Sequence, residues 1–285
     1  MSKPITLVLG GTGVKGITSI GVLQSFHKHD IKIKKIISSG ISSLISAQFA
    51  LGDDPDVLTE RFIHFFEGNN RSIWGLEQAS GLLMSPRTHL AGNLSYYLRE
   101  RSYCHANFQN NSILVWESAD PMINNLFDNK SFSDLKIPLA VSAIDIKQGK
   151  CVLIQEGKLK DAMRASIAYP GIFPPVSIGK MKLVSSNKFS ELPLAGITGN
   201  DSPVLAVDLP NPFYGVKPQS LLEVIAIVDD LRCREIKDKL LAKTDIIFQL
   251  KGLKQFRWGD YKQIPLIVAH ARKEADKFLK NNPLT

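Results

Sequence analysis

The segment Gly40–Leu44, with the sequence GISSL, has the residue types and spacing of a nucleophilic serine site. A short β-branched run precedes it and an apolar segment with helical spacing follows it, which predicts a strand, a sharp turn and a helix. A serine in such a turn is exposed in front of a helix N-terminus, as in the G-x-S-x-G nucleophile elbow. Ser42 is therefore the candidate nucleophile and Gly40 the glycine before it, with Leu44 in place of the second glycine. A serine-rich helix cap would produce the same local pattern.

A second candidate is the glycine-rich loop Gly10–Gly16, GGTGVKG, which follows the apolar run Ile5–Leu9 and precedes a helical pattern. Such a loop presents backbone N–H groups to an anion at the positive end of the helix dipole. The anion could be the oxyanion of an acyl-transfer intermediate or the pyrophosphate of a dinucleotide. Gly11, Gly13 and Gly16 match G-x-G-x-x-G, but the next strand ends in serines and lacks the acidic residue that holds the ribose. Nucleotide binding is therefore a minor alternative.

The elements that must position these segments alternate between strands and helices. Further strands are expected at Ile113–Trp116, Pro138–Ile146, Lys150–Ile154, Lys182–Val184, Val204–Val207 and Ile246–Leu250. Helices are expected after Asp53, from Pro86 to Arg101, before Pro170, from about Ser220 to Ala242 and up to Lys280. This alternation predicts an α/β fold, a three-layer α/β/α sandwich with a mostly parallel central sheet. With no linker visible, residues 1–285 are expected to form a single domain.

Composition and charge narrow the classes of partner and site. A formal net charge of +8 favours an anionic partner surface, and because the Lys and Arg residues are dispersed we expect a membrane and not a nucleic acid. Three cysteines, Cys104, Cys151 and Cys233, are too far apart for a zinc site or a disulfide framework, which indicates a reducing compartment. No metal and no cofactor are predicted.

Localisation follows from the apolar runs. None reaches about 18 residues, and no leader pattern precedes the first strand, so we expect a cytoplasmic protein. Its peripheral contact with anionic membranes would use the basic charge and the loop Trp74–Met84, which mixes large apolar residues without periodicity.

Four segments, taken together and in order, resemble the patatin-like phospholipase family. Leu9–Gly16 resembles its glycine-rich oxyanion loop, and Gly40–Leu44 its nucleophile elbow. Phe132–Val176 is similar to its middle segment, and Leu183–Pro193 lies where the family has a D-G-G or D-G-A motif. The resemblance extends over nearly the whole chain and implies the patatin-like α/β fold.

The resemblance implies a serine–aspartate dyad that cleaves lipid esters without a histidine. Carried over by residue, the roles would fall on Ser42 as nucleophile, on the N–H groups of Gly11, Thr12 and Gly13 as oxyanion hole, and on Lys15, Gly16 and Gly40 as supporting residues. Ser185 stands where the family has its aspartate, so the base is lost. Loss of the base in a serine hydrolase lowers the rate by about 10⁴ to 10⁶. None of the other carboxylates considered is placed as the family base is: Asp145, Glu191, Asp201 and Asp208.

Two functions remain open. In the first, the protein has lost most or all hydrolase activity and acts by binding a lipid, an acyl group or another protein. In the second, it is an active lipid acyl hydrolase, of phospholipase A or esterase type, that uses Ser42 with a non-standard base. Ser42 favours the second function, whereas Leu44, Ser185, Ser186 and Asn187 depart from the family motifs and favour the first.

Overall fold

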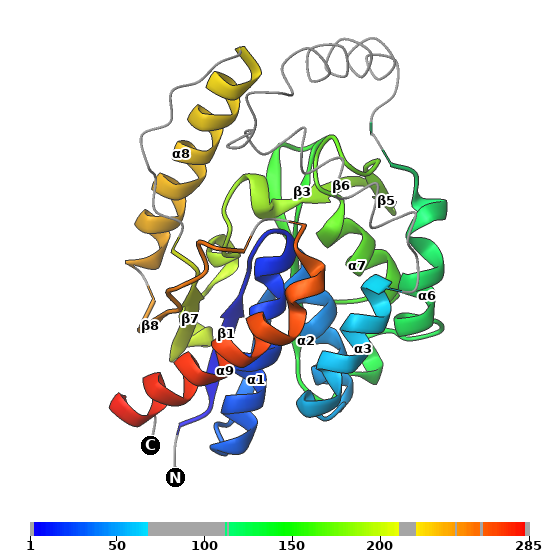
Figure 1. Ribbon diagram of the computed structural model, residues 1–285. Helices are drawn as coiled ribbons and strands as arrows, with labels where there is room; N and C mark the ends of the chain where they lie inside the picture. The colour runs from blue at the N-terminus through cyan, green and yellow to red at the C-terminus, as the bar shows by residue number, and fades with distance from the viewer. Residues whose placement is uncertain are drawn as a thin grey trace.

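The fold is a mixed β-sheet flanked by helices (Figure 1). The computed structural model describes residues 3–67, 112, 114–210, 221–242, 244–256 and 259–282. Expectations for the loop Trp74–Met84, the helix from Pro86 to Arg101 and Cys104 lie outside the described residues. Of the expected strand Ile113–Trp116, the described residues from Leu114 onward form no strand, and a short 3₁₀ helix begins at Trp116.

The sheet combines a parallel part with an antiparallel part. Its strands are β1 (Ile5–Leu9), β2 (Ile33–Ser38), β3 (Leu139–Asp145), β4 (Lys150–Ile154), β5 (Val176–Ile178), β6 (Met181–Ser185), β7 (Val204–Asp208) and β8 (Ile246–Gln249). Their order is β5-β6-β3-β2-β1-β7-β8, and β4 also pairs with β3. The strands β3, β2, β1, β7 and β8 are parallel, whereas β4 and β6 pair with β3, and β5 with β6, in antiparallel fashion. The expected α/β class is confirmed: the parallel strands extend from β3 to the β8 edge of the sheet, and the antiparallel strands β6 and β5 lie at the other edge.

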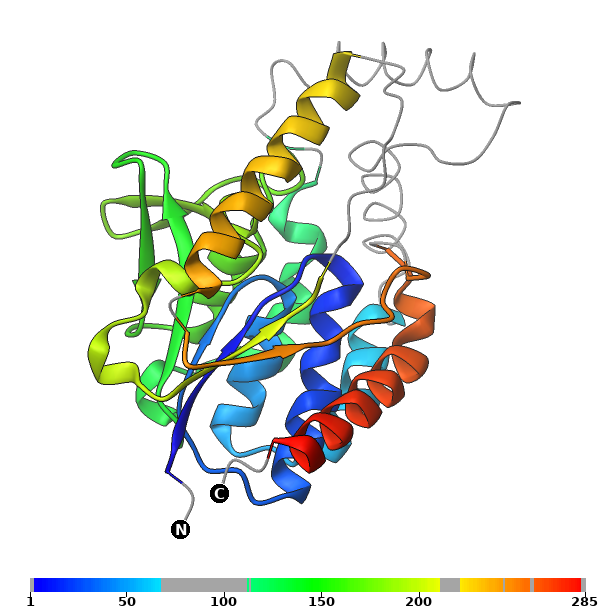
Figure 2. The same cartoon turned by 90° about the vertical axis from the view of Figure 1, so that its left-hand side faces the viewer.

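Helices lie on both sides of this sheet (Figures 1 and 2). They are α1 (Thr18–Lys28), α2 (Ile41–Leu51), α3 (Pro55–Glu67), α6 (Asp120–Phe127), α7 (Leu159–Ile167), α8 (Leu221–Leu241) and α9 (Ile264–Asn281). In Figure 2, α1, α2 and α9 lie on one side of the central strands and α8 on the other. Within the described ranges, no helix is both long enough and apolar enough to cross a bilayer.

The alternation of side chains along the strands builds two cores. Leu7 and Leu9 of β1 belong to the larger apolar cluster with the helices α1, α2 and α9, whereas Val8 belongs to a smaller cluster with Ile37 and Ala206. Successive residues of a strand point to opposite faces, so the two clusters lie on opposite faces of the sheet. Burial on both faces explains why these strands read as continuous apolar runs.

Two adjacent parallel strands deliver the site segments to one edge of the sheet. Strand β1 pairs with β2 so that Leu9 is opposite Ser38, and each is the last residue of its strand. The glycine loop therefore begins beside the turn that leads into α2. Strand β6 ends at Ser185, opposite Ala143 in β3, and turns directly into the 3₁₀ helix Ser186–Lys188.

Candidate active site

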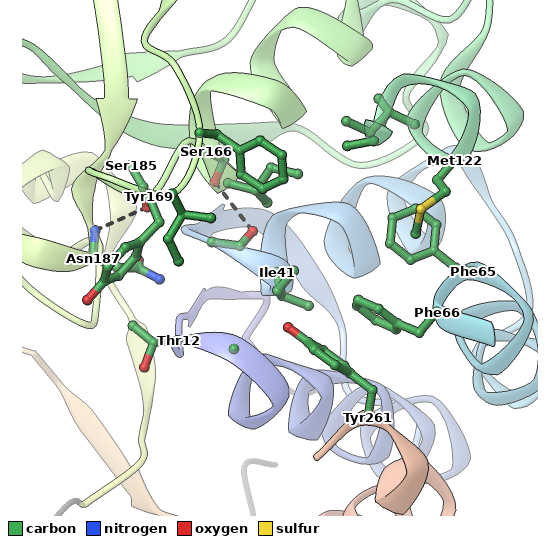
Figure 3. Close-up of a pocket in the computed structure, with 17 residues that line it drawn as sticks. Thr12, Ile41, Phe65, Phe66, Met122, Ser166, Tyr169, Ser185, Asn187 and Tyr261 are labelled. Atoms are coloured by element: carbon green, nitrogen blue, oxygen red, sulfur yellow. Dashed lines mark hydrogen bonds between the residues drawn. The ribbon is translucent and has the colours of Figure 1, made fainter. Parts of the chain in front are cut away.

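An apolar cavity lies where the β2–α2 turn, the glycine loop and the end of β6 meet. The space between its lining atoms amounts to about 660 Å³, a volume that includes open solvent. Its polar end is lined by Thr12, Gly13, Gly40, Ser185 and Asn187. Aromatic and aliphatic side chains line the remainder, among them Phe65, Phe66, Ile123, Ile172, Phe173 and Tyr261. Figure 3 shows Thr12, Ser185 and Asn187 on one side of this space and Phe65, Phe66 and Met122 on the other.

The turn between β2 and α2 places Gly40 at its most strained position. Gly40 is the N-cap of α2, with φ of 62° and ψ of −144°, a conformation that only glycine adopts readily. A Cβ atom added to Gly40 would lie 2.3 Å from Nδ2 of Asn187 and 2.9 Å from the carbonyl oxygen of Gly11. The backbone conformation and the neighbouring atoms thus both disfavour any side chain at this position.

Ser42 does not lie at the cavity, contrary to the expectation of an exposed hydroxyl. It is in the first turn of α2, fully buried, and absent from the cavity lining. Its Oγ donates to the carbonyl oxygen of Gly10 at 2.8 Å, and the carbonyl oxygen of Gly16 is a second acceptor at 3.2 Å. The same Oγ accepts a hydrogen bond from Oγ of Ser19 at 2.8 Å. The hydroxyl faces backbone acceptors on the glycine loop, and not the N–H donors that stabilise an oxyanion.

Two of the three residues expected for an oxyanion hole line the cavity. Thr12 and Gly13 line the cavity, and the 3₁₀ helix Gly13–Ile17 begins directly after Thr12. The first N–H groups of a helix have no partner within the helix and are available to a ligand. Gly11 does not line the cavity, but its carbonyl oxygen accepts a hydrogen bond from Nδ2 of Asn187 at 3.2 Å. The loop is therefore tied to the segment that follows β6.

The two supporting residues of the loop lie behind it. A Cβ atom on Gly16 would lie 2.9 Å from Cβ of Ile41 and 3.1 Å from the backbone nitrogen of Ser42, so this glycine lets α2 pack against the loop. Lys15 is half-buried and outside the cavity lining. Burial lowers the pKa of Lys15, and the nearby carboxylate of Glu191 partly opposes that shift.

Ser185 and Asn187 line the same polar end of the cavity as Thr12 and Gly13 of the glycine loop. Ser185 caps the short helix after β6, where its Oγ accepts a hydrogen bond from the backbone N–H of Asn187 at 3.4 Å (Figure 3). The Asn187 side chain lies between this cap and the carbonyl of Gly11. Reasoning from the sequence treated Asn187 only as a departure from the D-G-G or D-G-A block. Its contact with the glycine loop, 176 positions away along the chain, leaves no sequence signal of its own.

The charged residues near the glycine loop lie outside the cavity. The backbone of Glu191 packs against Gly10. Burial raises the pKa of the Glu191 carboxyl, and the positive charges of Lys237 and Lys15 partly oppose this shift. Lys237 Nζ forms a buried ion pair with Asp208 Oδ1 at 2.7 Å. Neither Glu191 nor Asp208 lines the cavity, nor does Asp145 or Asp201. No cluster of three or more potential metal ligands occurs in the described part of the chain.

Comparison with known proteins decides the family. The model of the family described as "Patatin-like phospholipase" matches residues 7–192, more than half of the chain. The chain belongs to the patatin-like phospholipase family. The matched range includes the glycine loop, the β2–α2 turn and the segment in place of the D-G-G or D-G-A motif from Leu183 as far as Leu192.

Relatives among curated proteins are longer than this chain. An uncharacterized NTE family protein of Mycobacterium tuberculosis, Rv1063c, is 27% identical over 210 residues, which cover 73% of this chain and 49% of that protein. Lysophospholipase NTE1 of Debaryomyces hansenii is 23% identical over 209 residues, covering 73% of this chain and 12% of that protein. The chain thus spans about half the length, or less, of these relatives.

Two solved structures found by comparison are also longer than this chain. VipD of Legionella pneumophila has a TM-score of 0.49 at 11% identity, covering 98% of this chain and 68% of that one. ExoU of Pseudomonas aeruginosa, in its complex with SpcU, has a TM-score of 0.42 at 15% identity, and the match covers 98% of this chain and 52% of the ExoU chain.

Proposed function

We propose that this patatin-like protein binds a lipid or acyl group in its cavity without hydrolysing it efficiently. The observation that carries the proposal is the glycine at position 40. A nucleophilic serine acts from the strained turn between strand and helix, and in this chain the residue with that conformation is Gly40. Gly40 has no nucleophilic group.

The apparent G-x-S-x-Leu pattern would then be two residues out of register with the elbow. If the elbow is centred on Gly40, the pattern G-x-S-x-G falls on residues 38–42, and Ser42 takes the place of the second glycine. The burial of Ser42 and its hydrogen bonds to loop carbonyls support this assignment. At the same polar end of the cavity, Ser185 has no carboxylate with which to accept a proton. Both members of the dyad are missing in this interpretation.

The lining of the cavity supports lipid binding. The larger part of the lining is aromatic or aliphatic, and burial of each methylene group of an alkyl chain contributes about 0.8 kcal/mol. The patatin-like family implies lipid substrates, so an acyl or alkyl chain is the expected occupant. We also propose that the ligand comes from an anionic membrane surface, which the net charge of +8 supports. Co-sedimentation with anionic vesicles should then decrease as salt rises, and equal binding to neutral vesicles would reject this source.

Hydrolysis is tested with a fluorophosphonate probe and a short p-nitrophenyl ester. The unmodified protein should not be labelled by the probe and should hydrolyse the ester only at the background rate. The variant Gly40→Ser/Ser185→Asp/Asn187→Gly restores a serine, a carboxylate and the space between them, and should gain both signals. Ser42→Ala in the unmodified background is the matched control. If the unmodified protein reacts with the probe and Ser42→Ala abolishes the reaction, the protein is an active hydrolase that uses Ser42 with a non-standard base.

A further inference from the structure

A second hollow lies on the surface between the helices α3 and α6, next to the apolar cavity. Among the described residues, Phe65 of α3 and Met122 of α6 are the only two that line both hollows. Both residues are half-buried. Their side chains therefore lie between the cavity and the surface hollow, which we call the α3–α6 groove. The described lining of this groove consists of Arg61, His64, Phe65, Pro121, Met122, Asn125 and Leu126.

Phe65 and Met122 lie at the end of the cavity away from its polar groups. Figure 3 shows them on one side of the space and Thr12, Ser185 and Asn187 on the other. An amphiphile binds with its head group near polar partners and its chain along apolar side chains, because a polar group buried without a hydrogen bond is destabilising. The end of a bound chain would then point toward Phe65 and Met122.

The aromatic neighbours of Phe65 hold its ring in place. The ring centroid of Phe65 lies 4.9 Å from that of Phe66 in an edge-on contact, and 5.6 Å from that of the fully buried Phe62. Phe66 in turn stacks on the buried Tyr261 with a centroid distance of 3.9 Å. A ring packed among buried aromatic side chains has little space in which to turn away. The wall between the two hollows is thus fixed on the α3 side, and Met122 completes it from α6.

We propose that Phe65 and Met122 set the longest acyl or alkyl chain that the cavity accepts. This proposal rests on the proposed function and deepens it by naming the residues that select chain length. Each methylene group that enters the cavity contributes about 0.8 kcal/mol, which is about fourfold in affinity. Once the chain reaches the wall, a further methylene group finds no apolar space and the affinity stops rising. A smaller side chain in the wall would let the chain continue into the α3–α6 groove.

Titration calorimetry with saturated fatty acids from octanoate to stearate, each below its critical micelle concentration, tests this proposal. A parallel series of 1-monoacylglycerols repeats the chain lengths with an uncharged head group. For the unmodified protein the dissociation constant should fall about fourfold per methylene group up to one chain length, and not beyond it. Met122→Ala should move this limit by more than about three carbon atoms, the space that its missing side-chain atoms leave. Phe65→Ala is a second variant and should move the limit in the same direction.

Two neighbours of Met122 on α6 provide matched controls, because Ile123→Ala and Leu126→Ala remove the same number of non-hydrogen atoms as Met122→Ala. Ile123 lines the cavity but not the groove, so Ile123→Ala should move the limit by about three carbon atoms or fewer. Leu126 lines the groove but not the cavity, so Leu126→Ala should leave the limit unchanged. If Ile123→Ala does not fold, the contrast of Met122→Ala and Phe65→Ala with Leu126→Ala decides the result.

The possible failures of this experiment are distinct. If Met122→Ala and Phe65→Ala leave the limit in place, or the affinity of the unmodified protein rises through the whole series, the wall does not select chain length, while the lipid-binding function stands. Equal shifts in Met122→Ala and Ile123→Ala would also overturn the proposal, because added volume alone would explain them. If neither series binds to the unmodified protein, the proposed function itself fails.

Discussion

A side chain at position 40 should destabilise the protein, and part of that effect should depend on Asn187. The test substitution is Gly40→Ala, which adds only a Cβ atom. At φ of 62° and ψ of −144° this atom strains the backbone, and it would also lie 2.3 Å from Nδ2 of Asn187. The substitution therefore combines a local conformational effect with a steric effect from a distant segment.

The two effects have separable magnitudes. Placing a non-glycine residue in this region of φ and ψ costs about 1–3 kcal/mol. Overpacking against Asn187 adds about 1–3 kcal/mol. Asn187→Gly should have a small effect of its own: it removes one hydrogen bond, worth about 0.5–1.5 kcal/mol, and also removes a buried acceptor that has no partner. In the double variant the steric effect of Asn187 disappears, whereas the conformational effect and the contact of the added Cβ with the carbonyl oxygen of Gly11 at 2.9 Å remain.

Urea unfolding of the four proteins in this double-mutant cycle measures the coupling. We expect Gly40→Ala to lower the free energy of unfolding by about 2–6 kcal/mol, and Asn187→Gly to restore about 1–3 kcal/mol of that loss. Gly149→Ala is the control for conformational strain alone, because Gly149 also has a positive φ of 63° but no atom within 4 Å of an added Cβ. Additive effects of the two substitutions would refute the argument that Asn187 fills the space beside Gly40.

Three further substitutions test the surroundings of the site. Ser42→Ala should lower the free energy of unfolding by about 1–3 kcal/mol in urea, because it leaves the carbonyl of Gly10 and the hydroxyl of Ser19 without their partner; an unchanged stability would contradict the buried network. The variant Glu191→Gln should become more stable relative to the unmodified protein as the pH rises above 4.5. A carboxyl with a raised pKa binds its proton more tightly in the folded state, so the unmodified protein loses stability when Glu191 ionises and the variant does not. A difference in the free energy of unfolding that does not change with pH would count against the burial of this carboxyl. Lys237→Met should lower the free energy of unfolding by about 3–5 kcal/mol, because it leaves the Asp208 carboxylate buried and unpaired. Adding Asp208→Asn to the same chain should restore part of that free energy. If it restores none, the broken ion pair is not the cause of the destabilisation.

The sequence by itself determined the class of fold and the family. The apolar runs of β1 and β7 and the alternation with helices predict a sheet with parallel central strands, because strands buried on both faces need apolar residues at every position. The glycine loop, the serine turn and the block after Leu183 occur in the order of the patatin-like family. Thr12, Gly13, Gly40 and Ser185 were expected near one site, and all four line the same cavity.

Only the tertiary structure decided which residue lies at the turn. The sequence allows the elbow to be centred on either Gly40 or Ser42, because the letters around both residues fit a strand, a turn and a helix. Pairing of β1 with β2 places Ser38 as the last residue of the strand, and α2 begins at Ile41, so the sharp turn falls on Gly40 and Ser42 enters the helix. The contact between Asn187 and Gly11 was equally hidden, since it joins segments that are far apart in the chain. Strand register and contacts of this kind depend on how distant segments pack together, which local residue spacing does not encode.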